Sequence, residues 1–139
     1  MWANVIDAKK LVKDKDEITA MGWEVRPEGI YDVIMQFNKY GKPMIVTENG
    51  AAFEDHLNDD GSVHDNRRIQ FFQAYLSEVL KAKNEGAHLN GYFLWSFMDN
   101  FEWAEGYEPR FGIVYNDFET QQRYPKNSAL WWQAFLNAK

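Results

Sequence analysis

Two apolar segments of this chain each run into acidic and aromatic residues. The first, Met44–Val46, is followed by the sequence TENG, whose glutamate is Glu48. The second, Leu89–Phe97, continues as MDNFEWAEGYEPRFG, in which four carboxylates alternate with aromatic rings. Carboxylates accept hydrogen bonds from hydroxyl groups, and an aromatic face packs well against the apolar face of a sugar ring. These residues therefore predict a sugar-binding site.

The same carboxylates also suggest a reaction. Glycoside hydrolysis requires two carboxyl groups that flank the glycosidic bond, roughly 5 Å apart for retention and farther apart for inversion. Spacing alone pairs Glu48 with Glu102. Other readings stay open, because a glutamate at a strand end is more often a salt-bridge partner or an acceptor at a helix N-terminus. A tryptophan-rich loop is likewise more often part of a core than a ligand platform.

Helices and strands alternate along the chain and would position these residues. The predicted elements are a helix that opens at Pro27 and stops at Gly41, a strand at Met44–Thr47, a helix from about Asn66 to Asn84, a strand at Leu89–Phe97, an irregular stretch from Met98 to Tyr124 and a helix from about Asn127. The apolar residues of the helices recur with a period of 3.6. Both strands are apolar nearly throughout, which is typical of parallel strands buried on both faces.

Two parallel strands do not complete a sheet, because their outer edges carry unpaired hydrogen-bonding groups that must be covered. In α/β barrels the functional residues lie where the strands end, and both strands here end in candidate site residues. The sequence therefore predicts part of a larger α/β body. Residues 1–20, which carry several lysines and few apolar side chains, predict a poorly packed N-terminal arm, and residues 21–139 form the α/β part.

Composition excludes several partners. The net charge is −6 and no basic stripe is present, which argues against nucleic-acid binding. The first residues contain no long apolar segment, and no run approaches eighteen apolar residues, so we expect neither a signal peptide nor a membrane partner. The chain has no cysteine, which excludes disulfides and thiolate metal sites. A cytoplasmic location is the default expectation.

The loop EDHLNDDGSVHDN is rich in groups that could hold a metal ion. Counting back from Gly61, however, places His56 and Asn58 where a calcium loop needs its first two acidic ligands. We therefore predict a solvated loop with a turn at the Asp59-Asp60-Gly61 segment and no metal. No glycine-rich phosphate-binding loop is present either, so no cofactor is expected.

Four longer motifs carry a family resemblance. GWEVRPEGIYDVI, KPMIVTENG, NGYFLWSFMDNFEWAEGYEPRFGIVYNDFETQQR and PKNSALWWQAF, in this order, resemble the C-terminal part of glycoside hydrolase family 1, the retaining β-glucosidase group. The match extends from about Met21 to Phe135. It implies an α/β fold, a fragment of a (β/α)8 TIM barrel that carries the last two strands and their helices. Residues 21–139 would be the C-terminal quarter of that barrel.

The resemblance also implies roles for individual residues. The family's nucleophile falls on Glu48, with Asn49 beside it in a supporting role. The sugar platform falls on Trp95. Glu102 would accept hydrogen bonds from the 4- and 6-hydroxyls, so the resemblance makes it a binding residue and not the acid. The remaining substrate-binding residues would be Trp103, which donates toward the 3-hydroxyl, and Phe111, which lines the pocket.

Glu102 also bears on the choice of sugar. Members that act on 6-phosphorylated sugars carry serine at this position, so Glu102 implies an unphosphorylated β-glucoside or a cellobiose-type substrate.

The chain departs from the family in one important respect. The family's general acid/base belongs to an Asn-Glu-Pro motif, which does not occur here. We therefore expect a β-glucosidase part that works with the missing barrel segment or with copies of itself. The alternatives are a sugar-binding module without turnover and a self-associating barrel fragment.

Overall fold

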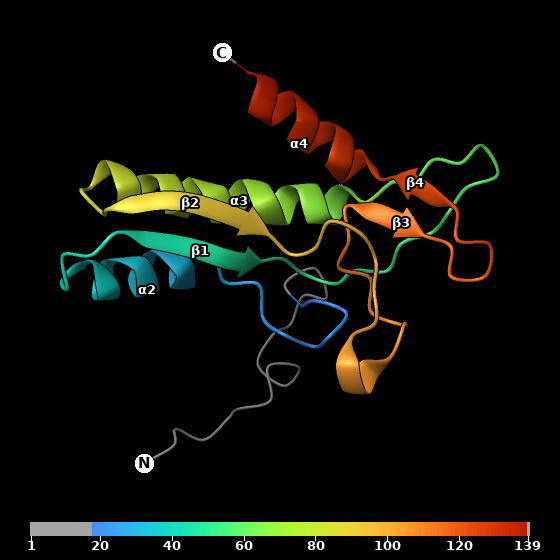
Figure 1. The fold of residues 1–139 in the computed structure, drawn as a ribbon, viewed down its shortest axis with the longest axis horizontal. Helices are drawn as coiled ribbons and strands as arrows, with labels where there is room; N and C mark the ends of the chain where they lie inside the picture. The colour runs from blue at the N-terminus through green and yellow to red at the C-terminus, as the bar shows by residue number, and fades with distance from the viewer. Residues whose placement is uncertain (1–17, 139) are drawn as a thin grey trace.

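The computed structural model describes residues 18–138. Its elements in chain order are α2 (Glu28–Asn38), β1 (Met44–Asn49), α3 (Asn66–Asn84), β2 (Leu89–Leu94), the short 3-10 helix η2 (Trp103–Glu105), β3 (Val114–Asn116), β4 (Arg123–Pro125) and α4 (Asn127–Asn137) (Figure 1). Residues 1–17 of the predicted N-terminal arm lie outside the described residues. Of the arm's last residues, Ala20 donates a backbone hydrogen bond to Ala52 at 2.9 Å. Within this range each helix is too short or too polar to span a lipid bilayer.

Strands β1 and β2 are parallel neighbours, as predicted, and α3 connects them (Figure 1). Met44 pairs with Leu89 at one end, and Asn49 pairs with Leu94 at the other. Strand β1 continues beyond the predicted Met44–Thr47, so Glu48 belongs to the strand itself. Strand β2 ends before the predicted Phe97, which places Trp95 on the loop that follows. Both candidate site residues thus lie at the carboxyl end of the parallel pair.

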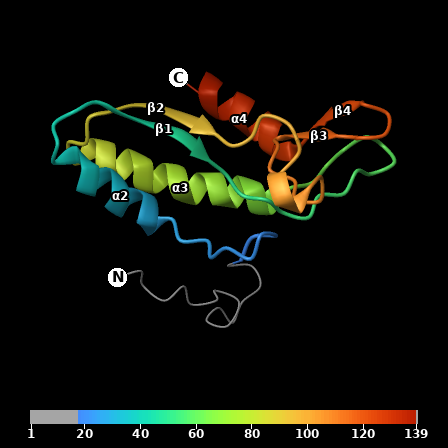
Figure 2. The ribbon, with the colours of Figure 1, turned by 60° about the horizontal axis from the view of Figure 1, so that its bottom comes forward.

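Helices α2 and α3 cover the same face of the two strands (Figure 2). Helix α3 has the bounds that its apolar period predicted. A core of buried residues lies between the helices and the strands, and Met44 and Val46 of β1 pack against it. Its members are Ile34, Val79, Ala82, Ala87 and Leu89. Burial of this apolar surface fixes the strands on the helices.

The opposite face of the strand pair is bare. Ile45 and Phe93 are 55% and 60% exposed. The prediction that both strands are buried on both faces is therefore wrong within residues 18–138. Alternation along a strand sends neighbouring side chains to opposite faces, and only one of these faces has helices packed on it here.

A second core lies near the carboxyl ends of β1 and β2. Trp132 of α4 packs edge-on against Phe72 of α3, with ring centroids 5.3 Å apart, and is stacked against Tyr92 of β2 at 6.1 Å. The buried members of this core are Ala51, Phe53, Phe71, Phe72, Leu76, Ile113 and Trp132. Helix α4, predicted from about Asn127, thus anchors the end of the sheet that carries the candidate site.

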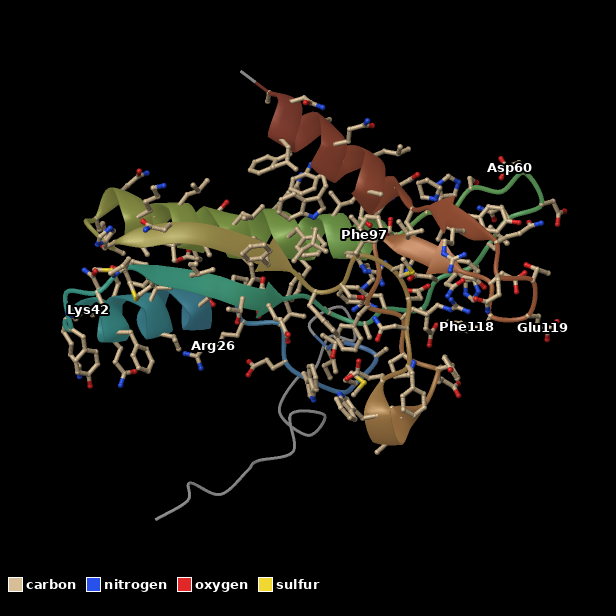
Figure 3. All side chains as sticks on the ribbon, in the orientation of Figure 1. Arg26, Lys42, Asp60, Phe97, Phe118 and Glu119 are labelled. Carbon is tan, nitrogen blue, oxygen red and sulfur yellow. The ribbon has the colours of Figure 1, made fainter. Side chains whose placement is uncertain are left out.

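The predicted irregular stretch Met98–Tyr124 contains regular structure. Strands β3 and β4 form an antiparallel hairpin in which Tyr115 pairs with Tyr124. Asp117 stabilises the turn, because its side chain accepts the amide of Glu119 at 3.0 Å. Phe118 and Glu119 are labelled on this hairpin turn in Figure 3. Strands of three residues are too short to show a two-residue period, and the turn residue with positive φ is Gln121, at 62°, where a glycine would have signalled the turn.

Candidate active site

The end of β1 is fixed by its neighbour. The Tyr92 hydroxyl donates to the Asn49 side-chain oxygen at 2.6 Å, and the Trp95 amide donates to the Asn49 carbonyl at 2.9 Å. Burial raises the pKa of Tyr92 above its usual range, so the hydroxyl keeps the proton that it donates. Glu48, one residue before Asn49, is thereby held at a defined position on the strand.

Gly50 lets the two strand ends meet. A Cβ atom at this position would lie 1.6 Å from the Trp95 carbonyl oxygen, a distance that only a glycine avoids. Gly112 has the same function farther along, where a Cβ would lie 2.2 Å from the Asp99 amide nitrogen. Both glycines allow one backbone segment to lie directly against another.

The loop after β2, residues 95–113, runs away from the strand end and folds back, so that an outgoing arm and a returning arm lie side by side. Ser96 donates its amide to the Phe111 carbonyl at 3.1 Å, and Ile113 donates to Ser96 at 3.0 Å. Phe97 lies next to this junction, between the end of β2 and β3 (Figure 3). Because the two arms are hydrogen-bonded, Phe111 is brought back to the strand end.

The tip of this loop carries η2. The Glu102 amide donates to the Gly106 carbonyl at 2.6 Å, which closes the tip into a tight turn. Trp103 has a positive φ of 46° and is 82% exposed. The turn therefore presents Glu102 and the Trp103 ring away from the core.

All six predicted site residues line one open cavity of about 490 Å³. We call it the aromatic hollow, and its lining residues are Trp23, Glu48, Asn49, Gly50, Trp95, Glu102, Trp103 and Phe111. Two of them, Trp23 and Gly50, were not predicted as site residues. The Trp23 ring lies 6.1 Å from the Phe111 ring, and its place in the motif GWEVRPEG was the signal that could have identified it.

The two carboxylates of the aromatic hollow are unpaired in the described part of the chain. Neither Glu48 nor Glu102 forms a side-chain hydrogen bond or an ion pair with residues 18–138. Carboxylate acceptors that are free, together with aromatic faces, suit a ligand with hydroxyl groups and an apolar face.

The other acidic residues of the second motif lie elsewhere. Glu105 and Glu108 line a separate cavity of about 630 Å³. Asp99 is buried, with 1% of its surface exposed. Of the four carboxylates in this motif, only Glu102, the one predicted as a site residue, lines the aromatic hollow.

The loop after β1, residues 50–65, is only partly solvated. Its tip is an exposed turn, as predicted, where Asp60 accepts the Ser62 amide at 2.9 Å (Figure 3). Asp55 and Asp65 are buried, however, because each meets a buried cation. Among residues 18–138 no group of three or more histidine or acidic side chains is placed to hold a metal ion.

Arg68 is the first of these cations. Its guanidinium group contacts Asp55 at 3.1 and 2.9 Å and Asp65 at 2.6 Å. Burial by itself would lower the pKa of Arg68, but the two aspartates outweigh burial and raise it. Asp65 also accepts the Ser128 amide at 2.8 Å, which joins α3 to the start of α4.

Lys126 is the second cation. Its ammonium group lies 2.6 Å from Asp55 and 2.8 Å from Asp99. Burial and the nearby Arg68 charge lower the pKa of Lys126, whereas the aspartates oppose that shift. Asp99 in turn accepts from Arg110 at 2.7 Å. We call these six residues the buried ionic network: Asp55, Asp65, Arg68, Asp99, Arg110 and Lys126.

Sequence comparison gives a family match over almost the whole chain. The sequence model described as Glycosyl hydrolase family 1 matches residues 3–139. Beta-glucosidase A of Thermotoga maritima is 53% identical over 116 residues, which cover 82% of this chain and 26% of that protein. Beta-glucosidase A of Acetivibrio thermocellus is 45% identical over 127 residues, 90% of this chain and 28% of that protein. A 6-phospho-beta-galactosidase of Staphylococcus aureus is 42% identical over 126 residues, 87% of this chain and 27% of that protein.

Solved structures give the same result. The β-glucosidase of Thermotoga maritima in complex with glucoimidazole superposes with a TM-score of 0.85 and 49% identity over 90% of this chain and 29% of that one. The psychrophilic β-glucosidase BglU of Micrococcus antarcticus gives a TM-score of 0.83 and 41% identity over 86% and 26%. The predicted fold is confirmed as part of a TIM barrel. The chain spans about a quarter of the length of the curated relatives that it matches.

Proposed function

The chain belongs to glycosyl hydrolase family 1, and we propose that it supplies the nucleophile and part of the sugar site of a retaining β-glucosidase. The observation that carries this proposal is the aromatic hollow, where the Glu48 carboxylate lies at a strand end among aromatic residues and has no side-chain partner in the described part of the chain. A relative named beta-glucosidase A matches the chain at 53% identity. The substrate is an unphosphorylated β-glucoside, with cellobiose-type sugars included.

The proposed reaction begins at Glu48. One carboxylate oxygen attacks the anomeric carbon and forms a glycosyl ester, while the bond from that carbon to the aglycone oxygen breaks and the aglycone takes the electron pair. Water then attacks the same carbon, the bond from that carbon to the Glu48 oxygen breaks with its electron pair returning to the carboxylate, and a proton of the water passes to solvent. Two inversions give a sugar with retained configuration. Asn49, held by Tyr92, keeps the strand end in place during both steps.

The remaining side chains hold the sugar. The Trp95 ring forms the platform, the Trp103 indole N–H donates to a hydroxyl and Phe111 closes the side of the hollow. Glu102 accepts hydrogen bonds from sugar hydroxyls. A 6-phosphate beside this carboxylate would be repelled, since two like charges 4 Å apart cost about 4 kcal/mol near a protein surface.

The chain contains no Asn-Glu-Pro sequence to supply the general acid, and the β1–β2 sheet within residues 18–138 is open. In the described residues β1 and β2 pair only with each other, so each strand has a free outer edge. A further cavity of about 660 Å³ lies along β1 and α2, and its lining residues include Val33, Phe37 and Ile45. The partner is the missing barrel segment or another copy of the chain, which would cover these edges.

The test uses a substrate that needs no acid. Dinitrophenolate is a good leaving group, so the purified chain is incubated with 2,4-dinitrophenyl β-D-glucoside. We expect release of at most about one dinitrophenolate per chain, because a slow second step lets the glycosyl ester accumulate. Mass spectrometry should locate the added sugar on the peptide that contains Glu48.

Two variants decide the outcome. Glu48→Gln should form no adduct, whereas Glu54→Gln should react like the unmodified chain, since Glu54 is an exposed carboxylate outside the aromatic hollow. Equal release by both variants would contradict the proposed nucleophile. Sugar binding without any adduct would instead favour the sugar-binding module.

A further inference from the structure

A buried lysine connects the two loops that line the aromatic hollow. Lys126 contacts Asp55 on the loop after β1 and Asp99 on the loop after β2, and all three side chains are 0% exposed. We propose that Lys126 is a positioning residue of the candidate active site, which holds the Glu48 side of the hollow against the Trp95 and Glu102 side. This inference deepens the proposed function and rests on it for its effect on the reaction.

Lys126 is itself fixed by a third element. Its amide donates to the Ile113 carbonyl at 2.9 Å, and its carbonyl accepts the Ala129 amide at 2.9 Å in the first turn of α4. Helix α4 is anchored by the buried Trp132. The ammonium group therefore reaches the two loops from a rigid support, as a positioning group requires.

The lysine reaches the outgoing arm of the second loop beyond Trp95, whose amide donates to the Asn49 carbonyl where the strands end. Phe53 donates its amide to the Arg110 carbonyl at 3.4 Å, and Arg68 donates to the same carbonyl at 2.6 Å. Both of these links meet the returning arm of the loop. Asp99 lies on the outgoing arm, between Trp95 and Glu102, and Lys126 ties that arm to Asp55.

The charges of the buried ionic network show which substitutions remove the contact between Lys126 and Asp55 without changing the net charge of the network. The buried ionic network holds three carboxylates and three cations. Lys126→Met alone leaves excess negative charge in the interior, which destabilises the whole fold. Asp55→Asn combined with Lys126→Met removes one charge of each sign. Arg68 then keeps Asp65 at 2.6 Å, and Arg110 keeps Asp99 at 2.7 Å.

The distance between the loops can be measured directly. The chain has no cysteine, so Glu54→Cys and Ala104→Cys place one spin label on each loop at exposed positions. Electron–electron double resonance gives the distribution of distances between the labels. The labelled chain is compared with the Asp55→Asn and Lys126→Met double variant and with Lys81→Met. Lys81 is a control because its ion pair with Glu78, at 3.5 Å, lies on the surface of α3.

We expect the double variant to unfold cooperatively in urea with unchanged helix content, while its distance distribution becomes about twofold broader as the loops separate locally. Lys81→Met should leave the distribution unchanged. A double variant with the original distribution would overturn the proposal, because the backbone would then hold the loops. Loss of cooperative unfolding in the double variant would also overturn it, because Lys126 would then be needed by the whole fold.

The reaction provides the second readout. If the unmodified chain forms the Glu48 adduct, the double variant should form it about 10²-fold more slowly, the usual cost of misplacing a reacting group by about 1 Å. An unchanged rate in a double variant with separated loops would overturn the positioning role. If the unmodified chain forms no adduct, the proposed function fails, whereas the distance measurement still decides whether Lys126 holds the loops.

Discussion

The buried ionic network and the aromatic hollow use the same kind of side chain in opposite ways. Asp55, Asp65 and Asp99 are buried, and each has a cation within 2.7 Å. Glu48 and Glu102 line an open cavity and have no partner among residues 18–138. A buried carboxylate must be compensated within the protein, whereas a free carboxylate at a cavity can accept hydrogen bonds from a ligand. Pairing, more than residue type, therefore distinguishes the aspartates of the network from the candidate site acids Glu48 and Glu102.

The two regions are nevertheless joined. Asp99 and Glu102 lie on the same loop, and Asp55 follows Glu48 beyond Gly50 on the other. The network therefore connects the two loops that line the hollow, whereas the carboxylates of Glu48 and Glu102 have no partner among residues 18–138. Substitutions in the network should therefore lower the free energy of unfolding, whereas substitutions in the hollow should change the reaction with a ligand.

The largest effect is expected at Gly50, where the two strand ends beside the hollow lie against each other. Gly50→Ala places a Cβ atom 1.6 Å from the Trp95 carbonyl oxygen, and relief requires the strand ends to separate. We expect a loss comparable to the whole stability of a small domain, about 5 kcal/mol or more. Urea unfolding followed by circular dichroism measures this loss.

Gly29→Ala is the matched control for that substitution. Gly29 lies in the first turn of α2, and an added Cβ would meet nothing within 4 Å. This change should stabilise the chain by up to about 1 kcal/mol. A Gly50→Ala chain that unfolds at the original urea concentration would show that the strand ends are not held as described.

The comparison itself is tested by Asp99→Ala and Glu102→Ala. Removal of Asp99 leaves the buried Lys126 and Arg110 short of a counter-charge, which should cost about 3–5 kcal/mol. Glu102 has no partner in the described residues, so its removal should change stability by no more than about 0.5 kcal/mol. The two unfolding free energies in urea give the answer. Equal losses would mean that Glu102 is a structural acid like Asp99.

The sequence predicted the elements whose signals are local. Helix α3 has an apolar period along its full length, and β1 and β2 are short apolar runs between turn signals. The six predicted residues of the hollow lie together because Glu48, Asn49 and Trp95 are at the strand ends and the loop after β2 brings Glu102, Trp103 and Phe111 back to them. Their roles in binding and catalysis stay predictions.

The network could not be predicted in the same way. Asp55 lies in a polar run without periodicity, and one of its partners, Lys126, is 71 residues away. Nothing near Asp55 in the sequence distinguishes it from the exposed Asp60. The hairpin of β3 and β4 was not predicted for a different reason, because strands of three residues are too short to show the alternation of apolar and polar residues. Asp55 is buried because partners far away in the sequence contact it, and a local sequence pattern does not contain that information.

A smaller effect is expected for ligand reactions in the hollow. Glu102→Gln keeps the size of the side chain but removes its charge, and a hydrogen bond to a charged group contributes about 1.5–3 kcal/mol. The rate of Glu48 labelling by dinitrophenyl glucoside, measured below saturation, should therefore fall by about tenfold or more. Glu105→Gln serves as the control, since Glu105 lines the separate cavity. Similar rates in both variants would remove Glu102 from the proposed sugar site.

The smallest effect concerns Tyr92, which connects the hydrophobic core to the aromatic hollow because its ring lies against the core and its hydroxyl donates to Asn49. Burial raises its pKa, so the folded chain keeps the proton at a pH where the unfolded chain has lost it. The free energy of unfolding should therefore fall as the pH rises above about 10, by at most about 1.4 kcal/mol per pH unit for this one proton.

Tyr92→Phe isolates that contribution. Lys126 has a lowered pKa, so the folded chain releases this proton at a lower pH than the unfolded chain does, and the free energy of unfolding therefore rises with pH at this group. The effect is the same in both chains and cancels in the comparison. Between about pH 8 and about pH 11, Tyr92→Phe should lose less stability in urea than the unmodified chain, whereas the exposed Tyr40→Phe should follow the unmodified chain. Parallel losses in all three chains would mean that the Tyr92 hydroxyl ionises freely. The bond to Asn49 would then not be shielded from water, and the end of β1 would belong to the open hollow and not to the core.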